Sequence, residues 1–158
     1  FGVAKNSIGS HCSPIYSFQT PSNLSNEEAA TIPVVYLTAY YSLFYKSNLK
    51  KGQSVLIHAG TGGVGMAAIH LAQSRGLTVF ATCSIKKRQH LKEMFGLKEY
   101  QIADSRSDAF VQTILEGTNQ RGVDAALNQL SGALQTATLR CMAPGGNFCE
   151  IGKYDIMQ

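Results

Sequence analysis

The sequence predicts an α/β protein in which helices cover both faces of a doubly wound parallel sheet. Two observations lead to this prediction. After about residue 54, β-rich apolar runs alternate with helical patterns, and these apolar runs are nearly continuous. Strands buried on both faces have this pattern, because the crossover helices of a parallel sheet pack on both of its sides. With 158 residues, of which 44% are hydrophobic and 15% charged, the chain can build one such hydrophobic core.

The first part of the chain lacks this alternation. Residues 1 to about 20 contain short β-like pieces such as PIYSF and have no clear helical period. Ser25 and Glu28 then fit a capping box, in which each side chain accepts a hydrogen bond from the other residue's backbone N–H, so a helix is expected to begin here. Pro33 lacks an N–H, and its ring clashes with the preceding turn. We therefore expect a short helix, a break at Pro33, and a longer helix to about Tyr45.

The remaining elements are expected in strict alternation. The apolar runs predict five strands, at residues 54–58, 78–82, 100–103, 123–127 and 147–151. The segments between them predict four helices, at residues 63–75, 86–95, 108–116 and 134–141. Because crossovers between parallel strands are right-handed, this order produces a doubly wound sheet.

The segment GTGGVG, from Gly60 to Gly65, matches G-x-G-x-x-G between a predicted strand and a predicted helix. One glycine makes the tight turn, a second lets the backbone approach a pyrophosphate, and a third lets helix and strand pack closely. The N–H groups and the dipole at the helix N-terminus attract phosphate. The pattern therefore predicts a Rossmann-type dinucleotide site, and glycines that serve only the turn are the alternative.

Two other nucleotide-binding classes do not fit. A Walker-type loop would place lysine after Gly65, where this chain has Met66. A short-chain dehydrogenase would need a Tyr-x-x-x-Lys pair, and no lysine here has tyrosine four residues before it.

The second predicted strand indicates which dinucleotide is bound. An NAD site normally has Asp or Glu at the end of this strand, where the carboxylate holds the ribose 2′-hydroxyl. No carboxylate occurs between Gln53 and Lys92, and the strand ends in ATCSIKKRQ. A hydroxyl and several cations would hold a 2′-phosphate by charge-assisted hydrogen bonds. We therefore expect NADPH, and a solvated basic first turn of a helix is the alternative.

Composition argues against several other functions. The net charge of +4 lies in two short clusters without interleaved aromatic residues, so no nucleic-acid partner is expected. No apolar run reaches the roughly 18 residues of a membrane span. The four cysteines have no CxxC spacing and the four histidines are scattered, so we expect no metal site and reduced thiols in a cytoplasmic protein.

Four blocks carry a resemblance, in this order: EEAATIPVVYLTAYYSL, GQSVLIHAGTGGVGMAAIHLA, GVDAALNQLSG and APGGNFCEIGKYDI. Together they resemble the enoyl reductase domain of animal-type fatty acid synthases and related polyketide synthases. These domains are zinc-free members of the medium-chain dehydrogenase/reductase superfamily. The first block looks closer to the animal fatty acid synthases.

The resemblance implies NADPH-dependent reduction of an enoyl chain carried on acyl carrier protein. Hydride would go to the β-carbon and a proton to the α-carbon. Residues 1–20 would be the tail of a GroES-like substrate domain, and residues 21–158 the NADPH-binding Rossmann domain. The implied partners are the acyl-carrier-protein-bound enoyl thioester and the other domains of a parent synthase, which would be a homodimer.

The resemblance also implies roles for individual residues. Lys153 matches a lysine proposed to donate the proton to the α-carbon, and it follows the fifth predicted strand at the edge where open α/β sheets bind ligands. A solvent-facing lysine at a strand end is the alternative. The cofactor would be bound in three parts: the pyrophosphate by Gly60, Thr61, Gly62, Gly63, Val64 and Gly65, the 2′-phosphate by Ser84, Lys87 and Arg88, and the nicotinamide near Thr38 and Asn128.

The chain departs from this family in three respects. Lys86 stands where the family often has an acidic or neutral residue, a change that should strengthen phosphate binding. Gln129 stands where the family usually has serine, beside the expected nicotinamide site. Most of the substrate domain is missing, and the acidic partner of Lys153 would lie beyond Gln158, so the chain reads as a piece that binds cofactor and lacks part of the substrate site. The alternatives are a free-standing NADPH quinone oxidoreductase and a non-catalytic NADPH-binding module.

Overall fold

The computed structural model describes residues 1–5 and 11–152, and its contacts divide the chain into two units, Phe1–Thr38 and Ala39–Gln158. The first unit contains an antiparallel hairpin of β1 (Gly2–Lys5) and β2 (Ser13–Ser17). It also contains most of α1 (Asn26–Tyr40). The predicted domain boundary after residue 20 is a statement about the parent protein and stays a prediction.

Helix α1 begins as expected and continues where a break was expected. Ser25 N–H donates to the Glu28 carboxylate at 2.8 Å, and Glu28 N–H donates to Ser25 Oγ at 3.1 Å, which confirms the capping box. Pro33 lies inside the helix, so the predicted break is wrong. A proline removes one intrahelical hydrogen bond and bends the axis, but the helix persists where neighbouring residues keep their own bonds. A π-helix, η1 (Tyr41–Lys46), follows directly and brings the helical segment to the predicted end.

The second unit is the predicted doubly wound sheet. Its five strands are all parallel and lie in the order β5-β4-β3-β6-β7. They are β3 (Ser54–Ile57), β4 (Thr78–Cys83), β5 (Ile102–Asp104), β6 (Val123–Asn128) and β7 (Met142–Glu150). The chain reverses its direction of travel across the sheet between β3 and β6, and at such a point open sheets bind ligands beyond the carboxyl ends of the strands.

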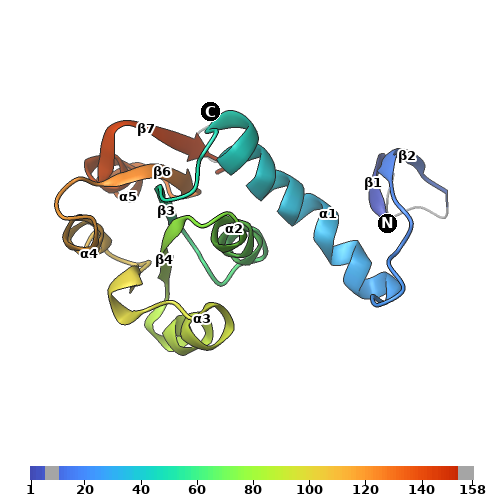
Figure 1. The fold of residues 1–158 in the computed structure, drawn as a ribbon, viewed down its shortest axis with the longest axis horizontal. Helices are drawn as coiled ribbons and strands as arrows, with labels where there is room; N and C mark the ends of the chain where they lie inside the picture. Colours follow the sequence, from blue (N-terminus) through green and yellow to red (C-terminus); the bar gives the residue numbers. More distant parts are fainter. Residues whose placement is uncertain (6–10, 153–158) are drawn as a thin grey trace. The chain divides into compact units, whose positions relative to one another are not determined.

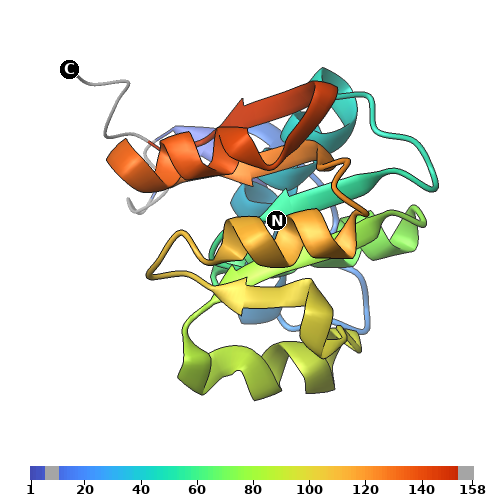
Figure 2. The same ribbon diagram turned by 90° about the vertical axis from the view of Figure 1, so that its left-hand side faces the viewer.

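Two layers of helix enclose this sheet. The four helices are α2 (Gly63–Ser74), α3 (Arg88–Phe95), α4 (Phe110–Gly117) and α5 (Gly132–Arg140), with the short turns η2 (Ile85–Lys87) and η3 (Glu99–Gln101) before α3 and β5. In Figure 1, α2 and α3 lie on one side of the strands and α4 and α5 on the other. Figure 2 looks onto the face covered by α4 and α5. The strands are buried as predicted, and every residue of β3 and β6 is buried.

The last strand begins earlier than predicted. Met142 pairs with Val123, whereas Asn147 pairs with Ala125, so the register shifts within the intervening residues. Gly145 in this segment has φ +74°, a conformation that favours glycine. The sequence APGG therefore forms an irregular start of β7 instead of a loop before it.

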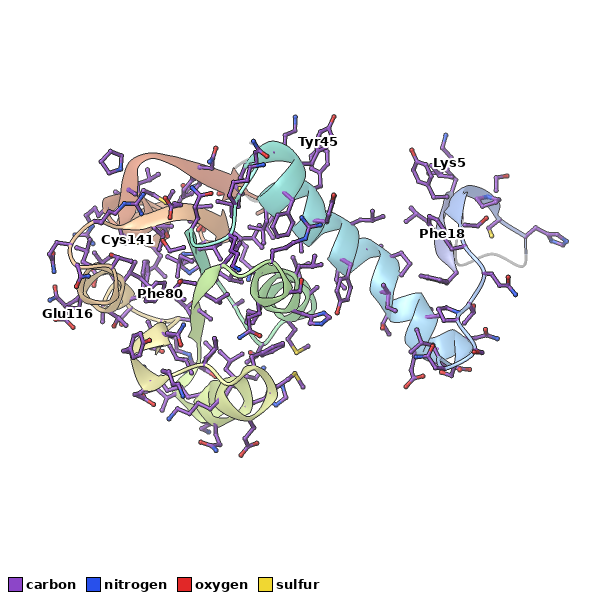
Figure 3. The ribbon with its side chains drawn as sticks, viewed as in Figure 1. Lys5, Phe18, Tyr45, Phe80, Glu116 and Cys141 are labelled. Carbon is purple, nitrogen blue, oxygen red and sulfur yellow. The ribbon has the colours of Figure 1, made fainter. Side chains whose placement is uncertain are left out.

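A hydrophobic core cluster lies between the sheet and the helices α4 and α5. Phe80 of β4 and Phe110 of α4 are fully buried in it together with Cys141. Figure 3 shows Phe80 and Cys141 inside this layer and Glu116 on the outer side of α4. Fully burying a large apolar side chain contributes about 1.5–3 kcal/mol, so these residues hold the layer together.

Candidate cofactor site

The glycine turn after β3 is built around close backbone contacts. Gly60 N–H donates to the carbonyl of Thr82 at 2.8 Å, and Gly62 N–H donates to the carbonyl of Ala59 at 2.8 Å. A Cβ at Gly65 would lie far inside van der Waals contact with the Ala59 carbonyl oxygen and 2.9 Å from Gly60 Cα. Gly65 therefore allows the first turn of α2 to pack against the end of β3, which is the third of the predicted glycine roles.

The residue that reverses the backbone here is an alanine. Ala59 has φ +47°, whereas the glycines with positive φ lie elsewhere in the described chain. The hydrogen bond from Gly62 N–H to the Ala59 carbonyl closes the tight turn, and Gly60 lies within it, so the predicted turn role of a glycine stays a prediction. The glycines of GTGGVG supply space where a Cβ would clash, and the positive φ falls on the residue before them.

The backbone at the N-terminus of α2 is exposed to solvent. Gly62 is the N-cap and has no side-chain capping bond, and both Gly62 and Gly63 are exposed. The first N–H groups of a helix have no intrahelical acceptor, so they point outward with the positive end of the helix dipole. A pyrophosphate fits this place, since its oxygens accept such N–H groups and its charge suits the dipole. Thr61 and Val64, which flank the glycines, are half-buried.

The predicted 2′-phosphate residues follow the carboxyl end of β4. Ser84 is half-buried and precedes η2, and Lys87 is exposed. Arg88, in contrast, forms an ion pair with Glu99, to which Lys92 also binds. Lys92 and Arg88 both donate hydrogen bonds to Glu99 and lower its pKa below the ordinary value, and the bond from Lys92 has the largest effect. The segment between Gln53 and Lys92 contains no carboxylate of its own, but the fold brings the carboxylate of Glu99 to it.

At the other end of the site, Asn128 closes β6 and is fully buried. Its carboxamide nitrogen donates to the Leu130 carbonyl at 2.8 Å and to Glu150 Oε2 at 2.6 Å. Gln135 of α5 also donates to Glu150 Oε2, at 2.9 Å, and the Gly152 N–H donates to Oε1 at 2.5 Å. Sequence reasoning missed Glu150; its signal is a carboxylate at the end of the last apolar run, NFCE, at the ligand-binding edge.

His58, at the end of β3, belongs to a buried polar network. Its Nδ1 lies 3.1 Å from Thr82 Oγ1, its Nε2 lies 2.9 Å from Thr138 Oγ1, and its ring packs edge-on against Phe110. Burial lowers the pKa of His58 to about 4, although the charge of Glu150 acts in the opposite direction. The imidazole is therefore neutral at pH 7 and has a structural role, as expected from its isolated position in the sequence.

Two predicted site residues are not placed with the others. Thr38 lies in the first unit, where its hydroxyl donates to the Val34 carbonyl at 2.7 Å. Lys153 lies outside the described residues. Their predicted roles beside the nicotinamide and as proton donor stay predictions.

Side chains that could bind metal are dispersed. Over residues 1–5 and 11–152, no three His, Cys, Asp or Glu side chains are grouped so that they could hold an ion. The four cysteines are all free thiols, with Cys83 and Cys141 buried. Burial raises the pKa of the Cys141 thiol to about 11, so it stays protonated. Over the same residues, no helix has both the length and the apolar character of a membrane span.

The zinc-binding dehydrogenase family model matches residues 63–157. Among curated proteins, the chain is 44% identical to the reducing polyketide synthase hmp8 of Hypomyces subiculosus over 98% of its length. It is 50% identical to the reducing polyketide synthase rdc5 of Metacordyceps chlamydosporia over 86% of its length. It spans only 7% and 6% of these two synthases.

Many solved structures are similar to the chain, and three of them illustrate the likeness. The CurK enoyl reductase superposes with a TM-score of 0.86 at 39% identity, over 91% of this chain and 43% of that one. The nucleotide-binding subdomain of the enoylreductase domain of PpsC from Mycobacterium tuberculosis gives 0.71 at 41% identity, over 78% and 68%. Mycobacterial Rv1454c, solved in complex with NADPH, gives 0.79 at 28% identity, over 89% and 44%.

These similarities agree with the geometry. A parallel sheet in the order β5-β4-β3-β6-β7, with a glycine turn after its central strand, forms the nucleotide-binding half of such enzymes. The chain belongs to the zinc-binding dehydrogenase family, among the enoyl reductase domains of the medium-chain dehydrogenase/reductase superfamily.

Proposed function

We propose that this chain is the NADPH-binding part of an enoyl reductase that acts in polyketide synthesis. The observation that carries the proposal is the exposed, uncapped N-terminus of α2 behind the glycine turn, beside a rim of hydroxyl and cationic groups at the end of β4. The similarity to fungal reducing polyketide synthases supports polyketide synthesis, and fatty acid synthesis is the second candidate.

The choice of NADPH over NADH rests on the end of β4. Ser84, Lys87 and Arg88 offer hydrogen-bond donors and positive charge where an NAD site would offer a carboxylate. The NADPH complex of Rv1454c, a structural neighbour, is consistent with this choice. Arg88 is available to a phosphate once it exchanges its partner Glu99, which is exposed and therefore weakly held.

In this reaction NADPH supplies the hydride that goes to the β-carbon of the enoyl thioester. The chain's own residues hold the cofactor: the amides of the α2 N-terminus bind the pyrophosphate, and Asn128 borders the nicotinamide half. Lys153 then supplies the proton to the α-carbon and stabilises the negative charge that develops there.

The partners follow from the same proposal. The substrate is an enoyl thioester on acyl carrier protein, and the chain works together with the other domains of a cytoplasmic, homodimeric synthase. Residues 1–20 are the tail of the substrate domain of that synthase.

Titration of the chain with NADPH and NADH tests the cofactor assignment. The change in nicotinamide fluorescence on binding measures both affinities. A charged hydrogen bond contributes about 1.5–3 kcal/mol, so NADPH should bind at least about a hundredfold more tightly through two such bonds. Lys87→Gln should weaken NADPH binding about tenfold and leave NADH unchanged. Lys50→Gln, before β3 at the opposite edge of the sheet, is the matched control, and tighter binding of NADH would refute the assignment.

Turnover tests the role of Lys153. In the complete reductase, Lys153→Ala should lower kcat for a crotonyl thioester by at least about a hundredfold, with NADPH affinity changed less than about twofold. Unchanged turnover would remove Lys153 from the mechanism.

The alternatives make different predictions. A free-standing quinone oxidoreductase would reduce quinones faster than crotonyl thioesters. A non-catalytic module would bind NADPH and reduce neither substrate.

A further inference from the structure

The carboxamide of Asn128 is held in one orientation. Its nitrogen donates to the Leu130 carbonyl and to Glu150 Oε2, at 2.8 and 2.6 Å. A carbonyl and a carboxylate only accept hydrogen bonds, so both positions require the NH₂ group, and a flipped carboxamide would place oxygen against oxygen.

This orientation leaves the carboxamide oxygen without a partner. Asn128 Oδ1 is buried, and no donor reaches it in the part of the chain that the structure describes. Buried acceptors are nearly always hydrogen-bonded, so an orphan of this kind indicates a donor that arrives from elsewhere.

The carboxylate that holds Asn128 is itself firmly held. Glu150 accepts hydrogen bonds from Asn128 of β6, from Gln135 of α5 and from the Gly152 N–H just after β7, so three donors converge on one half-buried side chain. The donors are all uncharged, and none of the ion pairs found among the described residues involves Glu150. Such an arrangement fixes the position of the carboxylate and, through it, the orientation of Asn128.

The place of Asn128 indicates which donor would arrive. The glycine turn and Ser84 follow β3 and β4, where the adenosine half of a dinucleotide binds, and the nicotinamide half then lies over β6 and β7. The nicotinamide ring carries one uncharged hydrogen-bond donor, the NH₂ of its carboxamide. Asn128 closes β6 and Glu150 closes β7, at this same edge.

We propose that Glu150 is a positioning residue for the nicotinamide: it holds the Asn128 carboxamide so that Oδ1 accepts an N–H of the nicotinamide carboxamide. This inference rests on the proposed function and adds to it the group that recognises the reactive half of the cofactor. Gln135 supports Glu150 from α5 and acts in the same direction with a smaller effect.

A binding cycle between protein and ligand tests this proposal. The probes are NADP⁺ and its 3-acetylpyridine analogue, in which a methyl group replaces the carboxamide NH₂, and calorimetry measures both. The wild-type chain should bind NADP⁺ about tenfold more tightly than the analogue, because only NADP⁺ pairs with the buried oxygen. Glu150→Met should reduce this ratio to about one or two, and Glu150→Gln, which keeps an acceptor oxygen for Asn128, should restore part of it.

Two further variants keep the test informative if Glu150→Met does not fold. Gln135→Met removes one of the donors to Glu150 and should lower the ratio about threefold. Glu116→Met, which removes the acceptor of the 2.6 Å hydrogen bond from Gln112 on the outer side of α4, is the matched control and should leave the ratio unchanged (Figure 3).

The third probe, 2′-phospho-ADP-ribose, separates the two hypotheses. It lacks the nicotinamide, so it should bind equally to the wild type and to every Glu150 variant that folds. Two results, each obtained with normal binding of this probe, would overturn the role of Glu150 alone. One is a ratio of NADP⁺ affinity to analogue affinity near one in the wild type. The other is a ratio that Glu150→Met and Gln135→Met leave unchanged. Failure of the wild type to bind either NADP⁺ or this probe would overturn the proposed function and this inference together.

Discussion

At the end of the site formed by β3 and β4, the functional groups are backbone amides of neighbouring residues. At the end formed by β6 and β7, they are side chains from several elements. Gly60 to Gly65 form the first end within one turn, which presents bare N–H groups. The second end brings Asn128 together with Glu150, which lies 22 residues away in the chain.

This difference determines which kind of substitution disrupts each end of the site. The first end depends on space, because any added Cβ at its tightest point meets backbone that cannot move independently. The second end depends on hydrogen bonds between buried polar groups, because a buried polar group that loses its hydrogen-bond partner lowers the free energy of unfolding by about 1–3 kcal/mol. A steric change should therefore damage the first end most, and the removal of a hydrogen-bond partner should damage the second.

The largest effect is expected for Gly65→Ala. The new Cβ would clash with the Ala59 carbonyl and with Gly60 Cα, so the turn must shift, which we expect to lower the free energy of unfolding by about 3 kcal/mol. NADPH binding should weaken at least about a hundredfold, since the displaced amides no longer meet the pyrophosphate together. Thermal unfolding and fluorescence titration measure the two effects.

Gly62→Ala is the matched control for this prediction. Its Cβ would meet only the Ala59 carbonyl oxygen, at 3.3 Å, and Gly62 has a φ of −85° that any residue adopts. The loss of stability should stay below about 1 kcal/mol. Equal losses in the two variants would show that close packing is not what makes glycine necessary at position 65.

The same contrast explains what could be predicted from the sequence. Strand and helix positions were predictable to within a few residues, because burial on both faces leaves a continuous apolar signal at each strand. The glycine turn was also predictable, since its parts are adjacent. The break at Pro33 was wrong, because the local cost of a proline does not determine whether the surrounding helix persists.

The network around Asn128 could be predicted only in part. Asn128 itself closes a recognisable strand, but the register of β6 on β7 brings Glu150 to it, and the position of α5 brings Gln135 to Glu150. The same limit applies to Arg88: the absence of carboxylates near it in sequence did not exclude Glu99, which η3 brings back. Contacts set by tertiary structure leave no fixed spacing in the sequence.

A change of pH should act through His58, whose side chain joins the end of β3 to Thr82 of β4 and to Thr138 of α5. Its pKa is about 4 in the folded chain and about 6.5 when unfolded, so the unfolded state takes up the proton first as the pH falls. The contribution of neutral His58 to the free energy of unfolding is complete above pH 6.5 and is lost between pH 6.5 and 4. By pH 5 the loss amounts to about 2 kcal/mol. Denaturant unfolding at pH 7 and pH 5 measures it, and His58→Gln should remove most of this difference.

Asp124 serves as an internal check on the pH experiment. Hydrogen bonds lower the pKa of Asp124 to about 2, and the bond from Arg121 has the largest effect. The contribution of Asp124 to the free energy of unfolding is therefore present above its ordinary pKa and is lost only as the pH falls toward 2. The two windows are therefore separate. A difference between pH 7 and 5 that persists in His58→Gln would place the titrating group elsewhere.

The smallest effect is expected at the rim of the first end, where side chains do contribute. Glu99 binds both Arg88 and Lys92 and is exposed, so Glu99→Gln should free two cations for the 2′-phosphate at little structural cost. NADPH affinity should rise about twofold to threefold at low salt, with NADH unchanged. The gain should disappear at about 0.5 M salt, because exposed charges are then screened within a few ångströms. A gain for both cofactors would mean that Glu99 acts on the pyrophosphate, and the rim would then not distinguish the two cofactors.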